Sequence, residues 1–548
     1  MRLCAIPRGR GARRSVVGSS DGPRGDLVNP ILIVGAGPTG LVLAIELARR
    51  GVPHSLIDQR PKPMLWDRAA VIKSRTLEIF AALGLADAFV SQGTRIRGVD
   101  FYAAGSRRAS FRLKDLDTPF PFTLGLSEGA TEQILTCELE RLGGRVERGI
   151  AFAGLEGDKT GVRARLREGG EERTLEASWL VGADGLHSKV RDAAGIGFPG
   201  HDHDRQWGVA DVRFDNWPYE RDLAAVMFDP LFMPIPIGGG VWRAYFRGDR
   251  ADASHRAHIE RCMKALAPGA AMASCDEPQL FQTHSRVATG FRAGRVLLAG
   301  DAAHACSPIE GHGMNGGIHD AFNLGWKLGL VAAGRAPDNL LDSYDAERRP
   351  VAGVVIASGD DAEAGAAKGD PAAIAGAVEA LATVEGQHKA ALGESELGLG
   401  YDESPILWRN DGEPLSPGAA AIGYRVGDAG PLESMDGPVR LHSVLAHPGH
   451  TVLVLAGQAD DAATGAALET ARQIGARFGP DVKAVVVRRG GRATAPDLLV
   501  DGSGAVHDRL AGDGGAGLCV VRPDGFLGLR RPAADPSAAE AYFSRIFV

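Results

Sequence analysis

The stretch "PILIVGAGPTGLVLAIELARRGVPHSLIDQR", residues 30–60, decides the fold of this chain. It begins with an apolar run typical of a buried strand and passes through a glycine-rich turn into a helical pattern. The helix is expected to end at Gly51, and a second strand follows it. A strand, a helix and a strand in this order form a βαβ unit, in which the two strands lie parallel. The pattern therefore predicts an α/β domain of Rossmann type.

The turn "GAGPTG" within this unit has the composition of a nucleotide-binding turn. Its glycines permit a tight turn and the close approach of a pyrophosphate, and the helix N-terminus that follows supplies partial positive charge. An acidic residue at the end of the second strand can accept hydrogen bonds from ribose hydroxyls. We therefore expect a dinucleotide here. The predicted contacts are Gly35, Gly37, Pro38, Thr39, Gly40, Asp58 and Gln59.

Two later segments each place an aspartate beside a glycine at the end of a predicted strand. They are "GADGLHSKVR", residues 182–191, and "LAGDAAH", residues 298–304. Either one alone is compatible with an ordinary turn, because Asp and Gly both favour turns. The second segment opens "AGDAAHACSPIEGHGMNGG", residues 299–317, where large side chains are scarce. This composition indicates that another molecule comes close to the backbone.

The bulk composition excludes several classes of protein. The chain has 548 residues, 44% of them hydrophobic, and a formal net charge of −7, so we expect a soluble multidomain protein without affinity for nucleic acid. The apolar run 31–48 is interrupted by Pro38 and Glu46, which argues against a membrane span. Six scattered cysteines without a CxxC pair suit a reducing cytoplasm. The motifs of serine hydrolases, zinc proteases and P-loop enzymes are missing from the sequence.

A metal site is considered at "HDHD", residues 201–204, because alternating side chains of an extended segment share a face. The sequence offers no further Cys or His cluster nearby, so we interpret this segment as a solvated loop and expect no metal ion.

Composition and hydrophobic patterning predict the following organisation. Residues 1–28 form a basic tail that we expect to be disordered. Residues 29–204 and 291–404 together form the Rossmann-like domain and a helical linker. An antiparallel, half-buried sheet, 205–290, is inserted between them as the substrate domain, and a small α/β domain follows at 405–548.

Taken jointly, five segments resemble the single-component, FAD-dependent aromatic hydroxylases, the flavoprotein monooxygenase family of phenol hydroxylase and the aromatic polyketide hydroxylases. They are "GAGPTGL", "DRAAVIKSRTLEIFAALGL", "GADGLHSKVR", "GDAAHACSPIEGHGMNGGIHDAFNLGWKL" and "LLDSYDAERRPVA". The C-terminal part is similar to the thioredoxin-like domain of the larger members, ending in "VRPDG" at 521–525. Because it lacks CxxC, we expect it to be structural and a candidate homodimer interface.

The resemblance implies an enzyme that binds FAD and uses NADPH or NADH with O₂ to hydroxylate a small aromatic substrate, phenolic or polycyclic, through a C4a-hydroperoxyflavin. This mechanism requires no protein nucleophile, so no catalytic residue is named. Two alternatives stay open within the same fold, a Baeyer–Villiger oxygenase and an antibiotic-inactivating monooxygenase. A non-catalytic FAD-binding scaffold is the alternative from another class, and coupled oxygen uptake would distinguish it.

The resemblance also assigns residues to the site. Asp301 is expected to hold a ribityl or ribose hydroxyl of FAD. Backbone N–H groups of Gly313, Met314 and Asn315 are expected to face the pyrimidine edge of the flavin. The FAD contacts implied by the resemblance are Arg68, Glu128, Asp184, Gly300, Asp301, Pro308, Gly311, Gly313, Met314 and Asn315.

Glu128 stands where the family usually has Gln, and His312 replaces a Gln or Leu, so both depart from the family pattern. Met, Phe and Trp make an adaptable apolar surface suited to a flat ligand. We therefore predict that the sheet domain lines the substrate pocket with Met227, Phe228, Phe232, Met233 and Trp242.

Overall fold

The computed structural model describes the chain from residue 29 onward, in ten stretches. They are residues 29–63, 68–103, 105–157, 161–204, 206–228, 231–248, 254–365, 370–409, 419–511 and 515–548. The predicted tail, 1–28, lies outside the described residues. Within those stretches, helices that combine the length and the apolar character needed to cross a membrane are not found.

The βαβ unit predicted from residues 30–60 forms the centre of a sheet that has six strands within the described residues, in the order β21-β22-β12-β1-β2-β8. All neighbours are parallel except β21 and β22. The strands are β1 (Ile31–Val34), β2 (His54–Asp58), β8 (Val146–Arg148), β12 (Trp179–Gly182), β21 (Arg292–Ala293) and β22 (Val296–Leu298). Their carboxyl ends meet at one edge, where ligands bind in such sheets.

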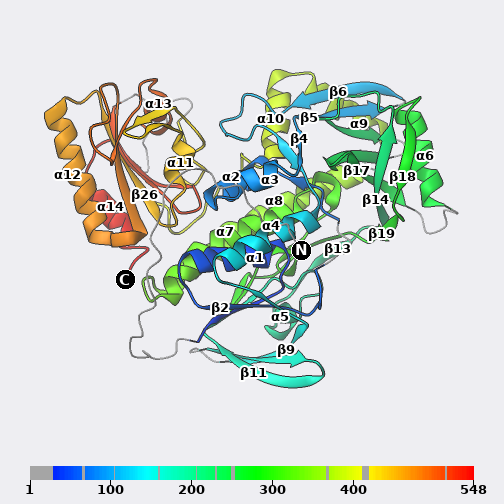
Figure 1. Cartoon of the computed structure of the whole chain (residues 1–548), viewed down its shortest axis with the longest axis horizontal. Helices are drawn as coiled ribbons and strands as arrows, with labels where there is room; N and C mark the ends of the chain where they lie inside the picture. Colours follow the sequence, from blue (N-terminus) through cyan, green and yellow to red (C-terminus); the bar gives the residue numbers. More distant parts are fainter. Residues whose placement is uncertain are drawn as a thin grey trace.

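Three long helices pack beside this sheet (Figure 1). They are α1 (Pro38–Arg49), α4 (Glu128–Arg141) and α7 (Gly313–Ala332). Residues 41–45 and Leu47 of α1 are fully buried. Gly325 of α7 lets that helix approach α1 closely, because a Cβ there would meet the Glu46 side chain at 2.7 Å. The close packing of α1 and α7 aligns their N-termini near the same sheet edge.

The second sheet lies at the opposite end of the molecule from the C-terminal unit (Figure 1). In the described part of the chain it has eight strands in the order β18-β14-β17-β16-β15-β5-β6, with β19 also paired to β14. The strands are β5 (Gly98–Ala103), β6 (Ser106–Arg112), β14 (Gln206–Asp215), β15 (Ala224–Phe228), β16 (Phe232–Gly238), β17 (Val241–Gly248), β18 (Ala271–Cys275) and β19 (Gln279–Phe281).

This sheet is antiparallel except at one junction, where β15 pairs in parallel with β5. The strands β5 and β6 precede the predicted inserted domain, 205–290, by a hundred residues. The sequence analysis made no strand prediction for residues 98–112, and no local pattern shows that two segments pair across such a distance. The sheet domain therefore includes residues 98–112 as well.

The C-terminal unit, orange to red in Figure 1, is built on a third sheet, ordered β25-β24-β28-β27-β26-β29-β30 among the described residues. Strands β26, β27 and β28 are parallel, and β29 and β30 continue the sheet antiparallel. The strands are β24 (Leu432–Ser434), β25 (Gly437–Val439), β26 (His450–Gly457), β27 (Val482–Arg488), β28 (Leu498–Val500), β29 (Ala516–Val521) and β30 (Leu527–Arg531).

Three small sheets and the remaining helices complete the described fold. The small sheets are β3 (Val71–Ile72) with β7 (Thr123–Gly125) and β4 (Thr94–Ile96), β9 (Ile150–Gly157) with β10 (Val162–Glu168) and β11 (Glu171–Ala177), and β13 (Gly200–Asp202) with β20 (His284–Val287) and β23 (His304–Ala305). The helices are α2 (Ser74–Ala82), α3 (Ala86–Val90), α5 (Lys189–Ala193), α6 (His255–Leu266), α8 (Asp342–Ala364), α9 (Pro371–Leu381), α10 (Val384–Ser395), α11 (Leu441–Leu445), α12 (Asp461–Phe478), α13 (Ala505–Leu510) and α14 (Pro536–Phe543).

A buried ion network fastens the C-terminal unit to the rest of the chain. The Arg522 guanidinium, from the "VRPDG" segment, donates to both oxygens of Glu347 on α8 at 2.7 and 2.8 Å. Glu347 also accepts from Lys327 Nζ at 2.7 Å, and Asp524 accepts from the Trp326 indole at 3.2 Å. Because a charge buried without its partner is costly, each member of this network requires the others.

His450, at the start of β26, is buried among aromatic rings at the same junction. Its ring centroid lies 5.2 Å from that of Trp326 and 5.4 Å from that of Phe543. Neither ring nitrogen has a hydrogen-bond partner among the described residues. Burial, reinforced by the charges of Arg522 and Arg50, lowers the pKa of His450 to about 3.

We predict that His450 makes the protein sensitive to acid. Its pKa in the folded state lies below the value near 6.5 of the unfolded chain, so the unfolded state binds the extra proton as the pH falls through 6.5. Between pH 7 and pH 5 the wild type should lose about 2 kcal/mol of unfolding free energy through this group, and His450→Phe should not. Urea unfolding at both pH values measures the difference.

The control for this prediction is His388→Phe, because His388 is exposed on α10. An equal loss of stability in the wild type and in His450→Phe would show that His450 does not take up the proton.

Candidate functional site

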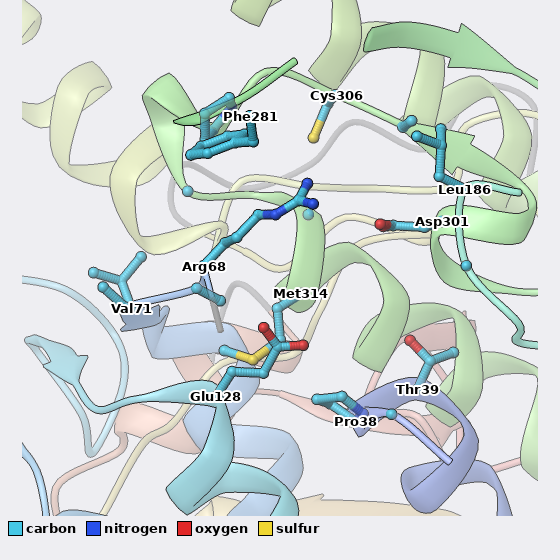
Figure 2. A pocket seen from close by; sticks show the side chains of 18 of the residues that line it. Pro38, Thr39, Arg68, Val71, Glu128, Leu186, Phe281, Asp301, Cys306 and Met314 are labelled. Atoms are coloured by element: carbon cyan, nitrogen blue, oxygen red, sulfur yellow. The ribbon is translucent and has the colours of Figure 1, made fainter. Parts of the chain in front are cut away.

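A cavity of about 620 Å³ is lined by residues at the carboxyl edge of the six-stranded sheet and by one face of the eight-stranded sheet. Figure 2 shows some of the side chains that line it. Residues at its sheet edge follow four parallel strands. Gly35 comes after β1, Asp58 ends β2, Asp184 comes after β12, and Asp301 comes after β22. Tertiary folding thus brings together the three separate segments that the sequence analysis selected.

The nucleotide-binding turn leaves space where a ligand needs it. Gly35 has φ +106°, and a Cβ there would overlap the Ala183 carbonyl oxygen at 2.1 Å, so this glycine is required by the neighbouring loop. A Cβ on Gly40 would meet the Gly35 carbonyl oxygen at 1.9 Å. Gly37, by contrast, faces the cavity at the N-terminus of α1, which has no side-chain cap within the described residues. This cradle fits a pyrophosphate.

Asp58 is anchored at the end of β2. Its carboxylate accepts from the backbone N–H groups of Ala36 at 2.9 Å and Arg60 at 2.8 Å, and it pairs with the Arg60 side chain. Burial would raise the pKa of Asp58, but the hydrogen bonds from Arg60 and Ala36 outweigh it and lower the pKa. The residue is thus an ionised hydrogen-bond acceptor at the cavity wall, as expected for a ribose contact.

Asp301 faces the cavity from the short 3₁₀ turn η1 (Gly300–Ala302) (Figure 2). Its side chain is open to the cavity while protein surrounds it on the other sides. This partial burial raises the pKa of Asp301, and the charges of His304 and Arg68 oppose the rise. Gly300 has φ +63°, and a Cβ there would meet Thr39 Oγ1 at 2.7 Å, so the glycine permits the contact between η1 and α1.

The position of η1 is set by Asp320, which is fully buried in the middle of α7. Asp320 accepts from the Gly300 N–H at 3.0 Å, lies 2.7 Å from His304 Nε2, and accepts from Arg348 Nε at 2.6 Å. Burial alone would raise its pKa, but the charges of His304 and Arg348 hold it at about 2. An ionised Asp320 therefore joins η1, β23 and α8 at one point.

The N-terminus of α7 points into the cavity through Gly313 and Met314. Asn315 is buried one residue behind them and organises the surroundings. Its Oδ1 accepts from the Lys73 N–H at 3.0 Å, and its Nδ2 donates to the carbonyl oxygens of Val71 at 3.1 Å and Gly311 at 2.9 Å. The helix N-terminus is thus held rigidly, and it favours a negatively charged group in the cavity.

Two carboxyl groups on the first turns of α4 also line the cavity. Glu128 is the residue that departs from the family pattern, and Glu132, one turn later, was missed by the sequence analysis. Burial and the nearby charge of Glu128 raise the pKa of Glu132 to about 7, and its Oε2 has no hydrogen-bond partner among the described residues. When protonated, the Glu132 carboxyl group can donate a hydrogen bond to an anionic ligand. An ionised Glu132 would instead repel that ligand.

Three further predicted positions have defined surroundings. Asp184 caps α5, accepting from Ser188 Oγ at 2.5 Å and from the Lys189 N–H at 2.8 Å. Arg68 projects into the cavity with its guanidinium 4.9 Å from the Phe281 ring centroid (Figure 2). His312 turns away toward Glu396, with Nδ1 2.5 Å from Oε1.

All but three of the predicted cofactor contacts line the cavity, and the structure describes every one of them. Gly40, Gly300 and Asn315 lie directly behind the lining and support it through their backbone geometry or hydrogen bonds. The cavity-lining predicted residues are Gly35, Gly37, Pro38, Thr39, Asp58, Gln59, Arg68, Glu128, Asp184, Asp301, Pro308, Gly311, Gly313 and Met314.

The substrate prediction requires correction, because of the five apolar side chains only Met233 lines the cavity. Met227, Phe232 and Trp242 lie on the opposite face of the sheet, where they pack with α6 in a separate core cluster. Phe228 shares a cluster with Met233 but does not reach the cavity wall. Successive residues of a strand point to opposite faces, and both faces of this sheet are buried, so the apolar pattern could not tell them apart.

The apolar wall of the cavity is built by neighbours that the sequence analysis missed. Val226, Ile235 and Tyr245 belong to the same sheet face as Met233, and Phe281 faces them from β19. The alternating pattern of each strand divides its residues between two faces of the sheet. The sequence does not show which of these faces lines the cavity.

A buried ion pair crosses the polar side of the cavity. Lys73 Nζ lies 2.8 Å from Glu394 Oε1, and the two side chains are 2% and 23% exposed. Thr123 Oγ1 donates to the same carboxylate oxygen at 3.2 Å. Glu394 comes from α10, which the sequence analysis treated only as part of a helical linker, so nothing in the local pattern pointed to it.

Comparison with known proteins identifies the class. The model of the FAD binding domain family matches residues 29–358. The chain is 33% identical over 532 residues to 6-methylpretetramide 4-monooxygenase of Streptomyces rimosus, spanning 93% of this chain and 90% of that protein. It is 31% identical over 517 residues to pentachlorophenol 4-monooxygenase of Sphingobium chlorophenolicum, spanning 91% and 93%.

Solved structures show the same fold along nearly the whole chain. An anhydrotetracycline hydroxylase from Streptomyces rimosus superimposes with a TM-score of 0.73 at 28% identity, covering 94% of this chain and 99% of that one. Aklavinone-11 hydroxylase, in a ternary complex with FAD and aklavinone, gives a TM-score of 0.75 at 26% identity, covering 95% and 99%.

The chain belongs to the FAD binding domain family, and its fold is of the mixed α/β class of the flavin-dependent hydroxylases. Within that family it is a flavoprotein monooxygenase that uses FAD, a reduced nicotinamide nucleotide and O₂. The residues present fit this cofactor, because the open cradle at Gly37, the acceptor Asp58 and the cavity-facing Asp301 all line one cavity.

We predict that Asp301→Ala weakens FAD binding. Removing the carboxylate leaves a ligand hydroxyl without its acceptor at a site closed off by protein, at a cost of about 1–3 kcal/mol, or roughly 5- to 150-fold in Kd. Fluorescence titration of the apoprotein with FAD measures the affinity. Asp215→Ala, at an exposed position on β14, is the control. Unchanged affinity in Asp301→Ala would contradict this placement of the cofactor.

A matched pair of methionine variants tests the two faces of the sheet. Met233→Ala enlarges the cavity and should raise the KM for substrate roughly tenfold. Met227→Ala removes buried volume on the opposite face and should cost about 2–5 kcal/mol of stability while leaving KM within about twofold. Steady-state kinetics and thermal unfolding of both variants provide the readouts. A larger KM effect from Met227→Ala would reverse the assignment of the faces.

Proposed function

We propose that this protein hydroxylates a flat, polycyclic phenol and that its own residues supply binding, orientation and exclusion of water. The observation that carries the proposal is the continuity of the cavity. It connects the nucleotide cradle at Gly37 and Asp301 directly with an apolar wall formed by Val226, Met233 and Ile235. A cofactor bound at one end would thus present its reactive part to a substrate at the other.

The wall has the character that a fused aromatic ring system requires. Val226, Met233, Ile235 and Phe281 offer apolar contact, and Tyr245 is fixed because its hydroxyl donates to the Arg68 carbonyl oxygen. Relatives with matching length are named for a pretetramide and for pentachlorophenol, which supports an aromatic substrate for this chain as well.

FAD, when reduced and bound, activates O₂ so that one oxygen atom can be transferred to an electron-rich carbon. The Gly37 cradle, Asp58 and Asp301 would hold the cofactor, and the N-terminus of α7 would stabilise negative charge near Gly313 and Met314. The Lys73–Glu394 pair supplies a charged group at the cavity wall that can orient a phenolic oxygen. Pro308 and Ile309 close the cavity beside the substrate end and help to exclude water.

We further propose that the C-terminal unit is a thioredoxin-like domain with a structural role. Its central parallel strands and antiparallel edge support this assignment. Cys519 is fully buried, and burial raises the pKa of its thiol to about 12, so it stays protonated and unreactive.

Isotope labelling tests the proposed reaction. With a phenolic polycycle as substrate, NADPH oxidation should accelerate, and the product should gain one oxygen atom derived from ¹⁸O₂. Mass spectrometry of products formed under ¹⁸O₂ and in H₂¹⁸O gives the source of the atom. A new oxygen derived from water would contradict a monooxygenase reaction.

The same products separate the two oxygenase outcomes. A hydroxyl group on an intact ring supports the proposal, and oxygen inserted between ring carbons would assign the chain to Baeyer–Villiger chemistry instead.

A further inference from the structure

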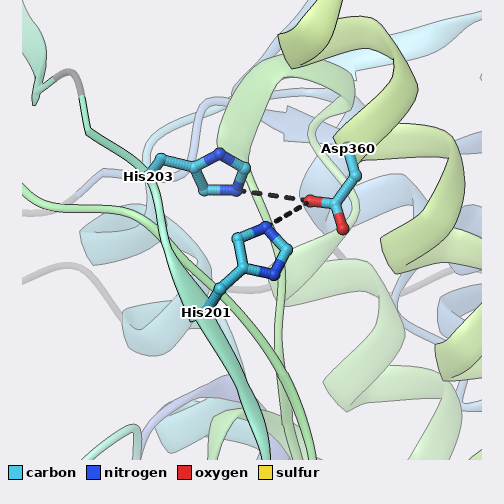
Figure 3. Close-up of side chains that lie close together, drawn as sticks. All are labelled: His201, His203 and Asp360. Carbon is cyan, nitrogen blue, oxygen red and sulfur yellow. Dashed lines mark ion pairs between the residues drawn. The ribbon is translucent and has the colours of Figure 1, made fainter.

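A cluster of two histidines and one aspartate lies on the surface outside the FAD cavity (Figure 3). His201 and His203 come from the "HDHD" segment, and Asp360 comes from α8. We call these three residues the His–Asp cluster. The sequence analysis interpreted the segment as a solvated loop, because it lacked a third ligand nearby. The structure places residues 200–202 in strand β13 and brings Asp360, distant in sequence, against the two imidazoles.

The ligand atoms of the three side chains lie close together. His201 Nε2 lies 3.5 Å from Asp360 Oδ1, and His203 Nε2 lies 3.4 Å from the same oxygen. Two ligands bound to a tetrahedral zinc ion at about 2.0–2.1 Å stand about 3.3 Å apart. These two separations match edges of a tetrahedron around an ion, and all three ligand atoms lie within 4.8 Å of one another.

Ser285 Oγ contacts two of the three ligand atoms. It donates to Asp360 Oδ1 at 2.6 Å and lies 2.9 Å from His203 Nε2, so a bound ion would replace these hydrogen bonds. Asp202 points to the other side of the strand, where it binds Arg286 at 2.7 Å. That pairing balances the charge of Arg286.

The exposure of the cluster permits a metal ion to enter from solvent. The His201 and Asp360 side chains are 56% and 29% exposed, whereas His203 is 12% exposed and fixed. The ligand set of two imidazoles and one carboxylate selects first-row transition metals such as zinc over calcium or magnesium.

We propose that the His–Asp cluster binds a divalent transition metal ion of the zinc class. Such an ion would fasten α8 to β13, which pairs with β20. Both α8 and β20 reach the cavity nearby. His284 of β20 lines the cavity, and Glu363, one turn beyond Asp360, accepts from Ser307 at the cavity and from the Trp207 indole at 2.8 Å. The ion would therefore stabilise the outer rim of the cavity without entering it.

Equilibrium dialysis and calorimetry with Zn²⁺ alone, on the FAD-loaded protein with any affinity tag removed, test this site. The wild type should bind one more zinc ion per chain than the double variant His201→Ala/His203→Ala, with a Kd in the micromolar range or tighter. Free thiols at Cys137, Cys275 and Cys306 are present in both proteins. Zinc bound to these thiols therefore does not change the difference in stoichiometry between the wild type and the double variant. The wild type should also show a Zn²⁺-dependent rise in Tm that the double variant lacks.

Two further variants distinguish a built site from incidental histidine binding. Asp360→Asn should lose the same zinc ion, whereas Ser285→Ala should bind zinc at least as tightly as the wild type, because it removes only hydrogen bonds that the ion replaces. His388→Ala, at an exposed histidine of α10, should bind zinc as the wild type does. Equal stoichiometry in the wild type and the double variant, or binding unaffected by Asp360→Asn, would overturn the proposal. Flavin absorbance and Tm without metal confirm that each variant is folded.

Discussion

The loop that carries Asp301 is held in place by the hydrogen bonds and ion pairs of the buried Asp320 carboxylate. This carboxylate holds the Gly300 N–H, His304 and Arg348 at the same time, and thereby joins the loop after β22 to α7 and α8. Breaking a buried ion pair of this kind costs about 3–5 kcal/mol, since it leaves an uncompensated charge. The cavity position of Asp301 follows from this anchor, because η1 has few large side chains of its own to fix it.

The central strands β15, β16 and β17 of the eight-stranded sheet are buried on both faces. One face packs against α6, and the other forms the apolar wall of the cavity. Strands that are buried on both faces carry large apolar residues on each side. The substrate wall therefore shares its composition with the core, and only the phase of each strand separates the two.

Charge burial connects the C-terminal unit to the catalytic part of the chain. Arg522 and Asp524 enter a network with Glu347 and Lys327, in which each ion is satisfied by the others. Such a network depends on correct geometry more than apolar packing does, and so it specifies one docked arrangement. The same helix, α8, carries Glu347, Arg348, Asp360 and Glu363, and it thus relates the C-terminal unit, Asp320, the His–Asp cluster and the cavity rim.

The sequence by itself predicted the βαβ unit and its glycine-rich turn from local rules, and the family resemblance predicted many of the residues that line the cavity. Gly37, Asp58 and the N-terminus of α1 belong to one βαβ unit, so a local pattern can predict them, whereas Gly35 is also required by the distant Ala183 carbonyl group. Only the tertiary structure decided that β5 pairs with β15, that Val226 rather than Met227 faces the cavity, and that Glu394 and Asp360 meet Lys73 and the two histidines. These contacts join segments over a hundred residues apart, and no local periodicity records which distant face a side chain will meet.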